Sequence, residues 1–187
     1  LSNTRKELEA LADSFDAVVV GSDMLWHPVN VEHDYYTLSF VPETVKKIAY
    51  ATSFGTTQIP NYQVKKYRTF LKRFSAISVR EKSGVEVIKK LDQNLKVEIV
   101  LDPTLLFTGK EWMKIQDKNP IVAENYIFCY FLGVNEWHRR IAKRISEYTG
   151  YKILMLPHLD EFVESDLDFA DQFLYNIDPA EFINLIR

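Results

Sequence analysis

The chain has 187 residues, of which 47% are apolar and 26% charged, and its formal net charge is −3. These values are ordinary for a soluble globular protein and argue against non-specific nucleic-acid binding. No apolar run approaches the about 18 residues needed to span a membrane, and the single cysteine, Cys129, excludes an intramolecular disulfide.

Strands and helices alternate in the first half of the chain. Apolar residues at helical spacing predict a helix within 1–14, and the small and β-branched residues at 17–20 predict a strand buried on both faces. A long connection at 24–44 is rich in aromatic residues, so we expect it to pack against the core. The pattern then predicts strands at 47–53, 76–80 and 97–101, with helices at 61–74 and 82–91 between them.

The second half begins after a polar segment without periodicity at 116–124, which we interpret as a linker. Such alternation predicts an α/β fold with parallel sheets. We expect a first domain at 1–118, a linker at 119–124 and a second domain at 125–187. The second domain should contain strands at 126–132, 152–157 and 173–176, and helices at 135–149 and 178–187.

Polar side chains and glycines follow the predicted strands at the point where each strand ends. The carboxyl ends of parallel strands share one edge of a sheet, so these residues should be neighbours in space. Hydroxyls, carboxylates and a cation at one edge predict a site for ligand binding or catalysis. The first domain contributes Gly21, Ser22, Asp23, Ser53, Phe54, Gly55, Arg80, Glu81, Asp102 and Pro103, and the second Leu132, Gly133 and His158.

The segment at 16–28 resembles the Gly-Ser-Asp-x-x-Trp-x-Pro signature of the polysaccharide pyruvyl transferase family. The matching residues are Gly21-Ser22-Asp23, Trp26 and Pro28. Further blocks resemble that family's landmarks in order and spacing, so the resemblance covers nearly the whole chain. These blocks are 47–55, 77–84, 100–106 with Glu111-Trp112, and 177–186.

The resemblance implies transfer of a pyruvyl group from phosphoenolpyruvate, the donor substrate. The acceptor would be two hydroxyls of one sugar residue in a bacterial cell-surface polysaccharide (an exopolysaccharide) or its precursor, including a lipid-linked one, and the product a ketal. The resemblance implies that the reaction needs no cofactor. It also implies that the enzyme is cytoplasmic, in solution or at the inner face of the membrane. Cysteine usage also favours a reducing compartment.

The family fold implied is two Rossmann-like domains that face a cleft, as in GT-B glycosyltransferases. On that comparison the first domain lacks its opening unit and the second its closing half. The family's Ser-x-His block, with its main catalytic histidine, would lie beyond Arg187, so we expect the fragment alone to be inactive. Some members place an arginine after the first strand of the second domain, where this chain has Leu132-Gly133.

Each of the candidate residues has two possible roles, one functional and one structural. Asp23 either acts as a catalytic or acceptor-binding carboxylate or caps a turn. Ser22 and Ser53 either bind sugar or phosphate oxygens or satisfy local backbone groups. Arg80 either binds an anionic substrate or forms an ion pair with Glu81.

The remaining candidates favour structural roles. Gly21 and Gly55 serve backbone geometry at the binding edge, and Trp26 either stacks on a sugar ring or anchors the long connection. Asp102 is expected mainly to form a turn. Cys129 is expected to be a buried thiol. No metal site is expected, because the histidines show no ligand spacing.

Two other functions stay open, because a fold does not fix a function. One is a nucleotide-sugar-dependent glycosyltransferase of the same architecture. The other is a non-catalytic relative that only binds carbohydrate.

Overall fold

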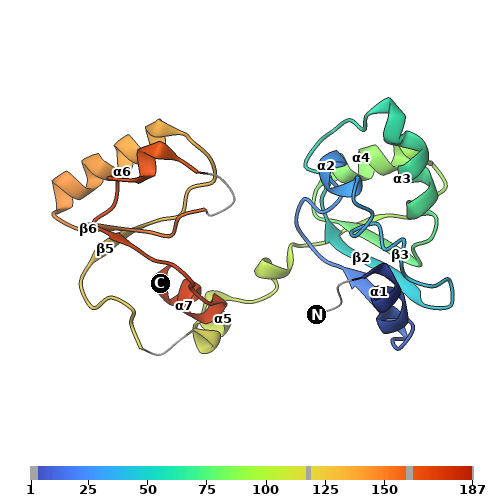
Figure 1. Cartoon of the computed structure of the whole chain (residues 1–187), viewed down its shortest axis with the longest axis horizontal. Helices are drawn as coiled ribbons and strands as arrows, with labels where there is room; N and C mark the ends of the chain where they lie inside the picture. Colours follow the sequence, from blue (N-terminus) through green and yellow to red (C-terminus); the bar gives the residue numbers. More distant parts are fainter. Residues whose placement is uncertain (1–3, 117–118, 159–161, 187) are drawn as a thin grey trace. The chain divides into compact units, whose positions relative to one another are not determined.

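The computed structural model describes residues 4–116, 119–158 and 162–186. The chain divides into two compact units, unit 1 (Leu1–Leu106) and unit 2 (Phe107–Arg187), because most contacts lie within one unit or the other. Each unit has its own sheet (Figure 1). The domain boundaries and the GT-B-like arrangement expected from the sequence stay predictions. Asp117 and Lys118, at the end of the expected first domain, lie outside the described residues.

Unit 1 contains a four-stranded sheet whose strands run parallel, as the sequence predicts. The strands lie in chain order across the sheet. The last strand is shorter than the predicted 97–101, since only Glu98 and Ile99 pair with the third strand. The strands are β1 (Ala17–Val20), β2 (Lys46–Thr52), β3 (Ala76–Val79) and β4 (Glu98–Ile99).

Helices cover both faces of this sheet (Figure 1). The short α2 (Pro28–Val31), α3 (Val64–Leu71) and α4 (Lys82–Leu91) lie on one side, and α1 (Arg5–Ala12) lies on the other. Right-handed crossovers between neighbouring parallel strands place successive helices on one face in this way. Single 3₁₀ turns precede α3 at Asn61–Gln63 and follow β4 at Pro103–Leu105.

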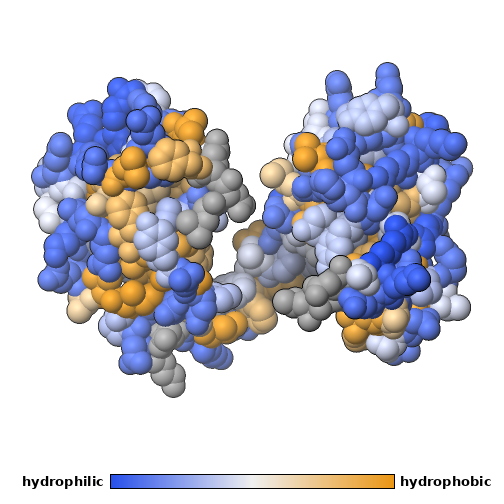
Figure 2. Space-filling view, viewed as in Figure 1, coloured by the Kyte–Doolittle hydropathy of each residue, from blue (hydrophilic) through white to orange (hydrophobic). Residues whose placement is uncertain are grey.

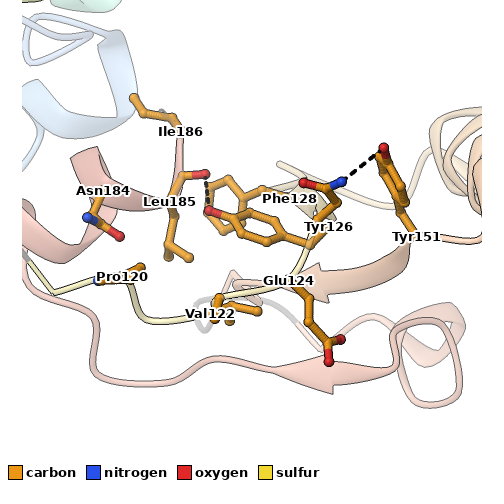
Figure 3. Close-up of a pocket in the computed structure, with 11 residues that line it drawn as sticks. Pro120, Val122, Glu124, Tyr126, Phe128, Tyr151, Asn184, Leu185 and Ile186 are labelled. Carbon is orange, nitrogen blue, oxygen red and sulfur yellow. Dashed lines mark hydrogen bonds between the residues drawn. The ribbon is translucent and has the colours of Figure 1, made fainter.

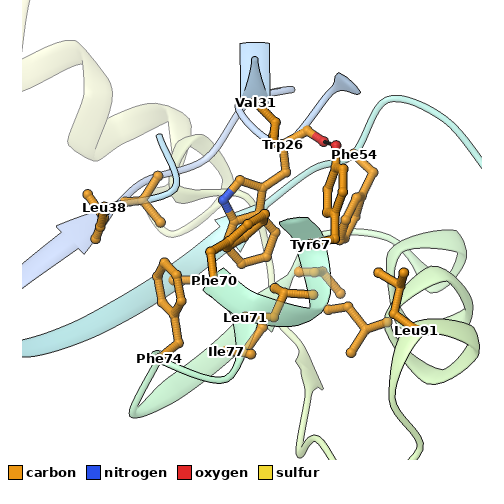
Figure 4. Packing of buried hydrophobic residues seen from close by; sticks show 14 of the residues in the cluster. Trp26, Val31, Leu38, Phe54, Tyr67, Phe70, Leu71, Phe74, Ile77 and Leu91 are labelled. Atoms are coloured by element: carbon orange, nitrogen blue, oxygen red, sulfur yellow. Dashed lines mark hydrogen bonds between the residues drawn. The ribbon is translucent and has the colours of Figure 1, made fainter. Parts of the chain in front are cut away.

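The core of unit 1 is built around Trp26, whose side chain is fully buried (Figure 4). Its rings lie 5.4–5.6 Å, centroid to centroid, from those of Phe54, Phe70 and Phe74. The aromatic connection at 24–44 thus packs against the core, as expected. It also contains α2, a helix too short to give a periodic signal.

Unit 2 contains a three-stranded parallel sheet with helices on both faces. Side chains alternate along β6: Ile153 and Met155 join the cluster that includes Ala142 of α6, whereas Leu154 joins the cluster that includes Leu185 of α7. The elements are α5 (Gly109–Ile115), β5 (Tyr126–Cys129), α6 (Glu136–Thr149), β6 (Lys152–Met155), a 3₁₀ turn at Glu164–Asp166, β7 (Gln172–Phe173) and α7 (Pro179–Leu185).

Capping residues define the helix ends of unit 2. The Asn135 side chain accepts a hydrogen bond at the start of α6, and Gly150 ends this helix with φ 73°. Asp178 caps α7, as predicted. Helix α5 was not predicted from the sequence, although Thr108 begins it with a capping box.

Two further features bear on function. Burial raises the pKa of the Cys129 thiol to about 11, so this group stays protonated at neutral pH and is not a nucleophile. No helix among the described residues has the length and apolarity to cross a membrane. Apolar side chains are nevertheless exposed on unit 2, across the middle of its visible face (Figure 2).

Candidate functional site

Asp23 lies just beyond the end of β1, where the backbone turns sharply. The chain adopts φ 96° there, a conformation that short polar residues tolerate better than most. The Asp23 carbonyl accepts a hydrogen bond from the Ser53 amide (2.8 Å), and its Oδ1 accepts one from the Met24 amide (2.7 Å). The carboxylate is 74% exposed, so it is fixed through its backbone while it remains open to a ligand.

Arg80 follows β3 and links the strand ends of this edge. Its Nη1 donates to Oδ2 of Asp102 (2.9 Å) and to Oγ of Ser22 (3.2 Å). Its Nη2 lies 3.7 Å from Oδ1 of Asp23, and its Nε lies 3.5 Å from Oε2 of Glu81. We call these five residues the carboxyl-edge cluster.

The carboxyl-edge cluster is negatively charged, because three carboxylates surround one guanidinium. The sequence suggested Glu81 as the acidic partner of Arg80, and the structure adds Asp23 and Asp102. A guanidinium already shared among carboxylates is a poor primary site for a multiply charged anion. The geometry therefore favours the ion-pair interpretation of Arg80 over binding of an anionic substrate.

Asp102 is the best-satisfied acid of the cluster. The Ser22 hydroxyl donates to Oδ2, and the amide and hydroxyl of Thr104 donate to Oδ1 at 3.0 and 2.8 Å. These bonds, with Arg80, hold the pKa of the Asp102 carboxyl well below its usual range. Asp102 thus stays ionised and cannot donate a proton near neutral pH. It also forms the turn expected for it, since it caps the 3₁₀ turn at Pro103–Leu105.

Replacing Asp102 by Asn should lower the melting temperature of the protein at pH 7 by several degrees. The pKa of Asp102 is lower in the folded state than in the unfolded chain, so the carboxylate stabilises the fold above the unfolded value of about 4. That stabilisation disappears as pH falls through the folded-state pKa. Because the folded-state pKa of Asp102 lies well below the unfolded value, the melting-temperature gap between wild type and Asp102→Asn should begin to narrow below about pH 4. The gap should be smaller at pH 3 than at pH 5 and should continue to shrink as the pH falls further.

The matched control for this experiment is Glu86→Gln, which removes an exposed carboxylate on α4. This variant should melt with the wild type at both pH values. A constant gap for Asp102→Asn across the same pH range would contradict the assignment of a stabilising carboxylate.

Ser53 and the two glycines frame the Asp23 turn. Ser53 is buried, and its Oγ accepts from the Gly55 amide (3.0 Å), which favours the interpretation that it satisfies local backbone groups. Gly55 has φ 60°, a left-handed conformation that favours glycine, and a Cβ there would lie 2.6 Å from Sδ of Met24, so the Met24 side chain would have to move. A Cβ on Gly21 would meet nothing within 4 Å, which leaves room for a ligand to approach the backbone.

Trp26 does not lie at the edge of the sheet. Its side chain is fully buried in the core of unit 1, where a sugar ring cannot reach it. The structure therefore supports the second interpretation of this residue, an anchor for the connection that leaves the Asp23 turn. Phe54 is also fully buried, and its ring packs against that of Trp26, so it belongs to the core and not to the edge of the sheet.

The candidates of unit 2 lie at the carboxyl edge of its own sheet. Leu132 is exposed, and Gly133, with φ 88°, offers its carbonyl to the buried guanidinium of Arg139 (3.3 Å). His158 lies beside a pocket of about 440 Å³ that Tyr175 also lines. These residues form a second rim that carries no cluster of charges comparable to that of unit 1 among the described residues.

A further pocket of unit 2, of about 650 Å³, lies at the opposite edge of the sheet, where β5 begins (Figure 3). The Tyr126 hydroxyl donates to the Leu185 carbonyl (3.0 Å) there, and the side-chain Nδ2 of Asn125 donates to the Tyr151 hydroxyl (3.1 Å). Glu124 is paired with Lys152 at 3.3 Å. Apart from Glu124 the residues that line this pocket are uncharged, so it is a weaker candidate site for acid-base chemistry than the carboxyl-edge cluster.

The residues that the structure describes contain no group of three or more His, Cys, Asp or Glu side chains able to hold a metal ion. The position of Asp102 at the carboxyl edge agrees with the sequence pattern, whereas its pairing with Ser22 and Arg80 was not predicted. No pattern in the sequence could have revealed it, because Ser22 and Asp102 are 80 residues apart.

Comparison with known families gives a match along the whole chain. The family model described as "Polysaccharide pyruvyl transferase" matches residues 1–187. A comparison with curated proteins finds no match.

Proposed function

Because the chain belongs to the polysaccharide pyruvyl transferase family, we propose that it transfers a pyruvyl group from phosphoenolpyruvate to two hydroxyls of one sugar residue, with formation of a cyclic ketal. The family name itself covers pyruvyl transfer to a polysaccharide. The donor and the ketal are our proposal. Phosphoenolpyruvate is made in the cytoplasm, so we also propose that the reaction takes place there, at the inner membrane face for lipid-linked acceptors.

The chemistry needs an acid, a carboxylate and a site for the acceptor. Protonation of C3 of phosphoenolpyruvate makes C2 resemble an oxocarbenium ion, to which one sugar hydroxyl adds as it gives up its proton. The C–O bond to phosphate then breaks, phosphate leaves with its electron pair, and C2 again resembles an oxocarbenium ion. The second hydroxyl adds to C2, loses its proton and closes the ketal. A carboxylate beside this centre can stabilise the cation or take the proton of the attacking hydroxyl. We propose Asp23 for that role.

The charge of the carboxyl-edge cluster supports acceptor binding in preference to donor binding. Phosphoenolpyruvate carries close to three negative charges, and three carboxylates would repel it. A neutral sugar instead offers hydroxyls that donate to the Asp23 carboxylate and accept from Arg80. The observation that carries this proposal is the exposed Asp23 carboxylate, held by its backbone within 3.7 Å of Arg80.

An assay of the whole natural protein tests the proposed function. Phosphoenolpyruvate and a panel of saccharides should give inorganic phosphate together with a ketal methyl signal in proton NMR spectra. Nucleotide sugars serve as alternative donors in parallel. Consumption of a nucleotide sugar alone would instead indicate a glycosyltransferase, and saccharide binding without turnover would indicate a binding protein.

A further inference from the structure

Strand β2 gains one residue relative to β3 close to the candidate site. Ala49 pairs with Ile77 and Thr52 pairs with Val79, so three steps along β2 match two steps along β3. The extra residue forms a β-bulge, in which Ala51 adopts φ 55° although it is fully buried. An alanine rarely adopts this conformation, so contacts from the surrounding structure must hold it there.

The side chain of Ser78 on β3 supplies those contacts. Its hydroxyl accepts a hydrogen bond from the Ala51 amide (3.1 Å) and donates one to the Ala49 carbonyl (3.0 Å). A bulge removes regular ladder partners from the backbone groups beside it, and such groups need replacements. The Ser78 hydroxyl replaces one donor and one acceptor at once.

The bulge determines how the end of β2 meets the Asp23 turn. Beyond it, the Thr52 hydroxyl donates to the Gly21 carbonyl (2.9 Å), and the Ser53 amide donates to the Asp23 carbonyl (2.8 Å). Successive side chains of a strand point to opposite faces, so removal of the extra residue would turn Thr52 to the other face. These two bonds to the turn would then be lost.

We propose that Ser78 is a positioning residue. Its hydroxyl stabilises the bulge of β2, and the bulge places Thr52 and Ser53 where they donate hydrogen bonds to the Asp23 turn. This inference rests on the proposed function, because Asp23 matters to catalysis only if pyruvyl transfer takes place at this edge. Arg80 follows β3, and its shortest contact is with Asp102 (2.9 Å), a residue outside both the bulge and the Asp23 turn.

The kinetic test compares Ser78→Ala with Ser78→Thr in the whole natural protein. Ser78→Ala removes both hydrogen bonds and should lower kcat at least tenfold, with the KM for phosphoenolpyruvate within twofold of wild type. Ser78→Thr keeps a hydroxyl and should restore kcat to within threefold. Ser39→Ala, which removes a different serine-to-carbonyl bond in unit 1, should turn over like wild type.

Amide hydrogen exchange separates this inference from the proposed function. The Ser53 amide should exchange at least tenfold faster in Ser78→Ala and normally in Ser78→Thr. The Ser75 amide, bonded to the Lys47 carbonyl at the other end of β2, should not change. If wild type forms no ketal, the proposed function fails while exchange still reports on the bulge. Unchanged Ser53 exchange in Ser78→Ala would overturn the positioning role, as would altered exchange with wild-type kcat.

Discussion

Replacing Asp23 by Asn should lower kcat by about 10²-fold or more while the KM for phosphoenolpyruvate stays nearly constant. The carboxylate is proposed to act on charge that develops in the transition state, so its loss reduces kcat and spares donor binding, whereas the KM for the acceptor, whose hydroxyls donate to Asp23, should rise by a smaller factor. Asn tolerates the positive φ of this position and keeps an oxygen for the Met24 amide. Steady-state kinetics of the whole natural protein, with a melting temperature for each variant, measure the effect.

Glu81→Gln is the matched control for Asp23→Asn. Glu81 also places a carboxylate beside Arg80, at 3.5 Å from its Nε. If Asp23 acts directly on the reacting sugar, Glu81→Gln should change kcat by only a few fold. Equal losses in the two variants would show that both act through the charge of Arg80. An Asp23→Asn variant that melts early but turns over normally would make Asp23 structural, and the catalytic carboxylate would lie elsewhere.

The edge that carries the site could be predicted from the sequence, because its signal is local. The apolar run at 17–20 stops abruptly at Gly21, and the stretches that become β2 and β3 stop in the same way at Ser53 and Arg80. Parallel pairing then requires these ends to meet, whichever residues fill the core. The α/β fold class and the location of Asp23 both follow from this pattern.

The contacts within the site could not be predicted, because they depend on residues far apart in the chain. Ser22 and Arg80 are 58 residues apart and meet through a single guanidinium nitrogen. The bulge at Ala51 leaves no trace in the sequence, since alanine is ordinary in a strand and only the pairing with β3 shows the extra residue. By contrast, the missed helix α5 did have a local signal, because Thr108 and Glu111 form a capping box.

Trp26 shows how burial decides between two interpretations of one residue. Beside a Gly-Ser-Asp turn, a tryptophan can stack on a sugar or anchor the chain, and the sequence fits both. The structure gives it three aromatic neighbours, a bond from its Nε1 to the Tyr36 carbonyl (3.1 Å), and a bond from the Tyr67 hydroxyl to its own carbonyl (2.6 Å). These contacts join the connection at 24–44 to α3.

Replacing Trp26 by Ala should therefore destabilise unit 1 by about 3–5 kcal/mol, the usual cost of removing a large buried ring. Native-state amide exchange of β2 reports this free energy for unit 1 alone. Trp26→Phe keeps an aromatic ring and should cost less, although the Tyr36 carbonyl still loses its donor. Trp137 is 60% exposed on α6, so Trp137→Ala should leave β2 exchange unchanged.

A sugar-stacking tryptophan would behave in the opposite way, with normal stability and a raised KM for the acceptor. That outcome would mean that the connection opens to admit the sugar, and the acceptor site would then extend from the carboxyl-edge cluster into the core of unit 1.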